Sequence, residues 1–119
     1  MTTDTLSRVF AALADPTRRD MVARLAGGDA TANQLAEPYR MTLQAVYKHL
    51  RVLEDAGLVT RPPGPQPRAV HLEVQVFDLM DNWIERHRRR AEQRYRRLDA
   101  LLAAFDEAED ETETDGDKS

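Results

Sequence analysis

The stretch from Met41 to Val59, MTLQAVYKHLRVLEDAGLV, predicts one helix with two different faces. At about 100° per residue, its large aliphatic residues fall in a single sector, which we expect to be buried. These residues are Leu43, Val46, Leu50 and Leu53. The opposite face carries Gln44, Ala45, Lys48, Arg51 and Val52, with Tyr47 and His49 on the two flanks. A helix that only completed a core would not need these donors, so the outer face is a candidate binding surface.

The residues on either side of this helix predict its surroundings. Thr42 can cap its N-terminus, and Gly57 can supply left-handed backbone after a helix over residues 43–56. Upstream, residues 31–34 have the form of a capping box, which opens a short helix that ends before Pro38. Two short helices joined by a tight turn predict a helix-turn-helix.

The rest of the chain adds two helices, a hairpin and a long final helix. The predicted elements are helices over residues 5–14 and 16–26, strands over 58–61 and 68–74 on either side of the loop PPGPQP, and a helix over 77–105. The fold class is therefore mainly α with a small β-hairpin. It is a winged helix-turn-helix of order ααααββα with a long C-terminal dimerisation helix.

The final helix carries an apolar residue at every seventh position, from Phe77 to Phe105. A helix of this length measures roughly 44 Å at 1.5 Å per residue, which is more than one small domain can cover. We therefore expect part of its apolar face, together with the first helix, to meet a second copy of the chain. The predicted interface residues are Leu6, Phe10, Met80, Ile84, Ala91, Leu98, Leu101 and Phe105.

The charge of the chain is unevenly placed. Residues 106–119 hold eight acidic residues and one lysine, a net charge of −7, whereas residues 1–105 hold 16 basic and 13 acidic residues, a net charge of +3. We therefore predict one winged helix-turn-helix domain over residues 1–105 and an acidic, disordered tail over residues 106–119. The overall net charge of −4 does not argue against a nucleic-acid partner.

Several function classes are disfavoured by composition. The chain has no cysteine, and its three histidines, at 49, 71 and 87, lie on different predicted elements, so we expect no metal site and no cofactor. It has no Gly-rich phosphate loop and no nucleophile beside a base, which disfavours an enzyme. No apolar run is long enough to span a membrane, and Asp4 and Asp15 interrupt any signal-peptide pattern. The sequence predicts a cytoplasmic protein.

Two motifs carry a family resemblance. ALADPTRR, residues 12–19, and AVYKHLRVLEDAGLV, residues 45–59, resemble signatures of the ArsR family of bacterial repressors, and the similarity extends over about residues 5–105. The chain most resembles the metal-independent branch of that family. The resemblance implies a dimeric winged-helix repressor that controls its own operon, with its recognition helix over residues 43–55. The family's usual Ser-x-His-Leu pattern stands here as Tyr47-Lys48-His49-Leu50.

Binding of an inverted-repeat DNA operator is the function that these observations favour. Gln suits adenine edges, whereas Arg and Lys suit guanine or phosphate, so Gln44, Lys48 and Arg51 are the predicted base contacts. The predicted contacts to the DNA backbone are Thr42, Tyr47, His49 and Arg68. The predicted partners are double-stranded operator DNA and a second copy, and a small-molecule effector is left open. The alternative is a dimeric protein-interaction module without specific DNA binding.

Overall fold

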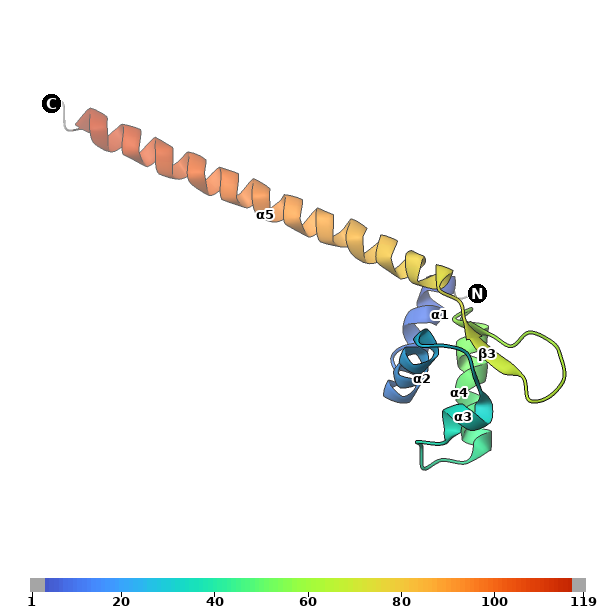
Figure 1. Cartoon of the computed structure of the whole chain (residues 1–119). Coiled ribbons are helices and arrows are strands. Elements are labelled where there is room, and N and C mark those ends of the chain that lie inside the picture. The colour runs from blue at the N-terminus through green and yellow to red at the C-terminus, as the bar shows by residue number, and fades with distance from the viewer. Residues whose placement is uncertain (1–3, 117–119) are drawn as a thin grey trace. The chain divides into compact units, whose positions relative to one another are not determined.

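The computed structural model describes residues 4–116, and the chain divides into two compact units, Met1–Met80 and Asp81–Ser119 (Figure 1). The elements in chain order are α1 (Thr5–Ala12), α2 (Pro16–Ala26), β1 (Ala30–Thr31), α3 (Ala32–Ala36), α4 (Leu43–Asp55), β2 (Val59–Thr60), β3 (Ala69–Leu72) and α5 (Gln75–Gly116). The mainly helical fold class with a long final helix is confirmed.

The first two helices begin at acidic caps. The Asp4 carboxylate accepts from the backbone N–H of Ser7 at 2.7 Å, and the Asp15 carboxylate accepts from that of Arg18 at 3.0 Å. These bonds hold the pKa of both carboxyl groups below the usual value. Helix α1 ends at Ala12, earlier than the predicted residue 14. The chain turns there, and the Arg18 side chain donates a hydrogen bond to the Ala12 carbonyl at 2.6 Å.

The helix-turn-helix of α3 and α4 has the predicted caps. Thr31 and Gln34 form a reciprocal capping box at the start of α3, and the Thr42 hydroxyl accepts from the N–H of Ala45 at 3.1 Å at the start of α4. After α4, Gly57 adopts a positive φ of 80°, and the N–H of Leu58 reaches back to the carbonyl of Leu53 at 2.9 Å. This Schellman arrangement ends the helix and turns Leu58 into the core.

The sheet has three antiparallel strands in the order β1-β3-β2, whereas the sequence predicted only a two-stranded hairpin. Strand β1 pairs Ala30 with Val70, and strand β2 pairs Val59 with Leu72. Strand β1 is missing from the prediction because two residues give no alternation of apolar and polar side chains. Its pairing fixes the start of α3 against the middle strand of the wing.

The core of the first unit lies between α1–α4 and the sheet. Helix α4 contacts α1, α2, α3 and β2, so it is the element around which the unit packs. The fully or nearly fully buried apolar residues are Val9, Ala12, Met21, Val22, Leu25, Ala32, Leu35, Val46, Leu50, Leu53, Ala56, Leu58, Val59, Val70, Leu72 and Met80. Val76 and Phe77, in the first turn of α5, pack against this core.

Helix α5 continues to Gly116, eleven residues beyond its predicted end at residue 105. Over residues 106–116 the structure therefore shows helix where the sequence predicted a disordered tail, and residues 117–119 lie outside the described part of the chain. Elongation of an existing helix needs no new nucleus, so the continuation requires less helix propensity than a separate helix would. The domain boundary between residues 105 and 106 rested on composition and stays a prediction.

Candidate nucleic-acid interface

Helix α4 has one buried and one exposed face, as predicted. Val46, Leu50 and Leu53 are fully buried. The predicted base-reading residues Gln44, Lys48 and Arg51 are all exposed, and their spacing of four and three residues places them along one side of the helix. One prediction for the inner face is wrong, because Leu43 is 41% exposed. It lies in the first turn of α4, beyond the part that packs on the core.

Tyr47 and His49, on the two flanks of α4, have different surroundings. Tyr47 is 40% exposed and stays available to a ligand. His49 is half-buried, with its Nδ1 3.4 Å from Arg18 Nη1 and 3.9 Å from the Asp15 carboxylate at the start of α2. This position favours a role in packing α4 against α2. A contact between His49 and the DNA backbone therefore receives no support from the fold.

A cation–aromatic clamp holds α3 beside α2. The guanidinium of Arg24 donates to the carbonyls of Leu35 at 2.6 Å and Gln34 at 2.8 Å, which satisfies acceptors at the end of α3. It also lies 5.5 Å from the ring centroid of Tyr39, whose hydroxyl donates to Asp20. Burial and the Asp20 carboxylate raise the pKa of Tyr39. The clamp fixes the turn that leads into α4.

The wing has a different arrangement from the one predicted. Arg68 was expected to reach the DNA backbone, but its guanidinium donates to the carbonyls of Arg61 and, at 3.2 Å, Pro62. The loop of four prolines offers carbonyls without competing N–H groups, so Arg68 closes the base of the wing. In the free protein the Arg68 guanidinium is thus held by carbonyls of the wing, and its contact with the DNA backbone stays a prediction.

Arg61 was not among the predicted site residues, but it joins the wing to α4. Its Nε lies 2.5 Å from an oxygen of Glu54, and its guanidinium carbon lies 5.5 Å from the ring centroid of Tyr47. The sequence offered no signal for these contacts, since Arg61 lies beyond the end of α4 and no helical spacing relates it to either partner. The tight turn at Gly57 brings them together.

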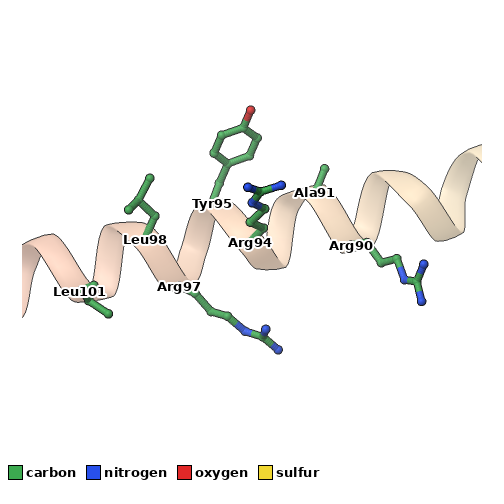
Figure 2. Close-up of a pocket in the computed structure, with 7 residues that line it drawn as sticks. All are labelled: Arg90, Ala91, Arg94, Tyr95, Arg97, Leu98 and Leu101. Carbon is green, nitrogen blue, oxygen red and sulfur yellow. The ribbon is translucent and has the colours of Figure 1, made fainter.

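The second unit presents an exposed apolar face on α5. Within residues 81–110 no residue is buried, and the exposed apolar side chains include Trp83, Ile84, Ala91, Tyr95, Leu98, Leu101, Leu102 and Phe105. A shallow hollow along this face is lined by Ala91, Tyr95, Leu98 and Leu101 and by three arginines. Figure 2 shows Ala91, Tyr95 and Leu98 on one side of the helix, with Arg90 and Arg97 directed to the other.

The predicted dimer residues are not all equally available. Ile84, Ala91, Leu98, Leu101 and Phe105 are exposed, as is Phe10 on α1. Leu6 is partly buried against the core of its own chain. Met80 is only 8% exposed and belongs to that core. Met80 is therefore removed from the candidate interface, because its side chain is already covered within the first unit.

Among residues 4–116, no three His, Cys, Asp or Glu side chains form a group that could hold a metal ion. The helices of the same range include none that is both long and apolar enough to cross a membrane.

Comparison with known proteins identifies the family. The family model of a helix-turn-helix domain matches residues 13–62, which include α3, α4 and the start of the wing. A crystal structure of an ArsR family transcriptional regulator is 35% identical, with a TM-score of 0.72, over 75% of this chain and 98% of the other. The chain belongs to the ArsR family.

Two further proteins are similar to this ArsR-family chain. The transcriptional repressor SdpR of Bacillus subtilis is 32% identical over 79 residues, which cover 66% of this chain and 88% of the repressor. The homodimeric winged helix-turn-helix DNA-binding domain Mb0332 of Mycobacterium bovis is 25% identical, with a TM-score of 0.57, over 71% of this chain and 82% of that domain. The ArsR-family chain is thus a DNA-binding transcriptional regulator and not an enzyme. The alternative of an interaction module without DNA binding is set aside.

Proposed function

We propose that this regulator is a homodimeric repressor that binds an inverted-repeat operator upstream of its own gene. The observation that carries the proposal is the outer face of α4, where Gln44, Lys48 and Arg51 are exposed. The opposite face is buried at Val46, Leu50 and Leu53. Side chains on such a face can reach base edges in the major groove, where each base pair presents a distinct pattern of donors and acceptors. A regulator of this kind acts in the cytoplasm, where the bacterial chromosome lies.

Three residues are proposed as the base contacts and two as the backbone contacts. Gln44, Lys48 and Arg51 are assigned to base edges. Tyr47 is exposed on the flank of α4, and Thr42 is exposed at its N-terminus, so both are assigned to the DNA backbone. The hydroxyl of Thr42 already accepts from Ala45, which leaves its proton available to a phosphate oxygen.

A second copy of the chain is proposed to cover the apolar face of α5. Exposed apolar side chains there include Ile84, Leu98 and Leu101, and such a face is stabilised by burial against another apolar face. The similar Mb0332 domain is homodimeric, which supports this occupant. Two-fold symmetry would place two α4 helices in successive major grooves about 34–36 Å apart, and this spacing predicts an operator of two inverted half-sites.

A mobility shift of the purified protein on its own upstream DNA, at two salt concentrations, tests the proposal. We expect a discrete complex that unrelated competitor DNA does not displace and that weakens steeply as the salt concentration rises, because phosphate contacts release counterions. Smeared binding that unrelated DNA removes completely would contradict recognition of an operator. Footprinting of the discrete complex would then show whether the protected sequence is an inverted repeat.

A further inference from the structure

Three contacts meet at Arg61, just after β2 at the base of the wing. Its Nε lies 2.5 Å from Oε1 of Glu54, near the end of α4. Its guanidinium carbon lies 5.5 Å from the ring centroid of Tyr47, two turns earlier on the same helix. Its backbone carbonyl accepts from the guanidinium of Arg68 across the wing. One residue therefore links the recognition helix, an exposed aromatic side chain and the loop.

The ion pair with Glu54 anchors the Arg61 side chain. Both side chains are about three-quarters covered, with exposed fractions of 24% and 29%, and the paired Nε and Oε1 atoms are shielded from solvent. The two atoms are close but are not aligned as a hydrogen bond, so the contact is mainly electrostatic. A charge pair in this setting is screened less by salt than an exposed one. The guanidinium plane therefore stays beside α4.

The contact with Tyr47 connects this anchor to the binding surface. A guanidinium within about 6 Å of an aromatic centroid is attracted to the face of the ring. Tyr47 is 40% exposed, and a helical backbone leaves an aromatic side chain two common χ1 rotamers, so without a neighbour its ring would sample both. Arg61 supplies that neighbour, and it comes from outside the helix.

We propose that Arg61 is a positioning residue for DNA recognition, which orients the Tyr47 ring on α4 and couples the wing to that helix. The inference rests on the proposed function, because it matters for recognition only if Tyr47 meets DNA. Ordering Tyr47 before binding lowers the entropy that is lost in the complex, so Arg61 raises affinity without touching the operator. Its effect must therefore depend on the presence of the Tyr47 ring.

A direct contact between Arg61 and a phosphate is the competing explanation. The two roles differ in three measurable ways. A phosphate contact contributes independently of Tyr47, lowers the salt slope by about 1 when it is removed, and is retained by lysine. A contact with an aromatic face is only partly retained by lysine, whose ammonium is attracted to the ring but lacks the planar stacking surface of guanidinium.

A double-mutant cycle on operator affinity separates these roles. The variants are Arg61→Gln, Tyr47→Ala and the double variant, each measured at several salt concentrations. We expect Arg61→Gln to weaken operator binding about 5-fold to 10-fold, in keeping with the strength of a cation–π contact. The double variant should bind no more weakly than Tyr47→Ala alone, and the salt slope of Arg61→Gln should equal that of the wild type.

Three further variants control for charge, anchoring and stability. Arg61→Lys keeps the charge but loses the planar guanidinium, so it should bind more weakly than the wild type and no more weakly than Arg61→Gln. Glu54→Gln removes the anchor and should lose affinity in the same direction. Arg96→Gln makes the same charge change on the exposed surface of α5 and should leave the affinity unchanged. Thermal unfolding of each variant without DNA identifies any loss that follows from a weakened fold.

If the affinity losses of Arg61→Gln and Tyr47→Ala add up in the double variant, and Arg61→Gln lowers the salt slope, the proposal is overturned in favour of a phosphate contact. If the affinity for every DNA sequence falls by the same factor, in proportion to the fall in melting temperature, Arg61 has only a structural role and the proposal is overturned. The ring orientation is also tested without DNA, by nuclear Overhauser contacts between the Tyr47 ring and the Arg61 side chain. Their absence in the free protein would overturn the proposal even where the operator complex forms. If they are present and no operator complex forms, the proposed function fails instead.

Discussion

The two units of the chain use apolar residues in opposite ways. Residues 4–80 bury all sixteen of the apolar core residues, whereas residues 81–110 bury none, although Ile84, Leu98 and Leu101 lie there. The first unit buries most of its apolar pattern in its own core, and its exposed large aliphatic and phenylalanine side chains are Phe10, Leu43, Val52, Val74 and Leu79. The second unit also has regularly spaced apolar residues, but no surface of the same unit covers them. We therefore interpret them as the binding surface for a partner.

Local charges support the second unit where packing does not. Glu85 pairs with Arg88 at 2.5 Å and with Arg89 at 3.2 Å, and these contacts lower the pKa of its carboxyl group. Such pairs on a helix contribute only a few tenths of a kcal/mol each. The helix of the second unit therefore gains little from each local contact, and burial against a partner would contribute far more. Substitutions in each unit test this difference between buried and exposed apolar residues.

Leu50→Ala, in the core of the first unit, should have the largest effect. Leu50 is fully buried on α4, and truncation of a buried leucine costs about 2–5 kcal/mol through lost transfer energy and the cavity left behind. Chemical denaturation should show the midpoint falling by the corresponding amount. A loss below 1 kcal/mol would mean that the first unit packs less tightly than its burial indicates.

Leu98→Ala, in the second unit, should act on association instead. Leu98 is 53% exposed, so its truncation leaves no cavity within the chain. If a second copy covers it, burial of the exposed half of each leucine side chain contributes about 0.75–1.5 kcal/mol. The dimer loses two such contributions, which weakens it about 10-fold to 100-fold. Sedimentation equilibrium measures the change. If the dimer dissociation constant is unchanged, the interface lies elsewhere, and the apolar face of the second unit is not covered by a second copy.

Arg51→Ala tests the exposed face of the first unit. If Arg51 reads a base, the change should cost about 1–3 kcal/mol of operator affinity and relax specificity at one position. Binding to a set of operators with single base changes measures this. A uniform loss across all sequences would reassign Arg51 to a phosphate contact.

Thr42→Ala should destabilise the first unit less than Leu50→Ala does. The hydroxyl of Thr42 accepts from the N–H of Ala45, and loss of such an N-cap costs about 1 kcal/mol. Thermal unfolding should show a modest fall in melting temperature. Thr42→Ser keeps the cap and serves as the matched control, and it should remain close to the wild type.

The smallest expected effect is the pH response of His71 on β3. Its Nδ1 lies 2.9 Å from the Asp29 carboxylate, and this bond raises the pKa of His71. Because the folded pKa is raised, the stabilisation is fully present below the ordinary pKa of histidine and is lost as the pH rises through the folded value. An NMR titration should give His71 a higher midpoint in the wild type than in the Asp29→Asn variant. Equal midpoints would contradict the ion pair.

Local features of the sequence were enough to predict most of the helices. The caps at Asp15, Thr31 and Thr42, the stop at Gly57 and the apolar spacing of α4 each depend on residues a few positions apart. These contacts form within one turn, so they can be predicted without knowledge of the rest of the fold. The predicted order of the helices followed from the same signals, whereas the family resemblance rested on the motifs at residues 12–19 and 45–59.

The sequence itself determined which segments form helices, which face of α4 is apolar and which polar side chains are opposite that face. Only the tertiary structure decided which of those side chains stay available. It paired β1 with β3, partly covered His49, buried Met80, turned Arg68 onto the wing and brought Arg61 beside Tyr47. These outcomes depend on packing between elements and on the turns that bring distant residues together, for which no local spacing in the chain gives a signal.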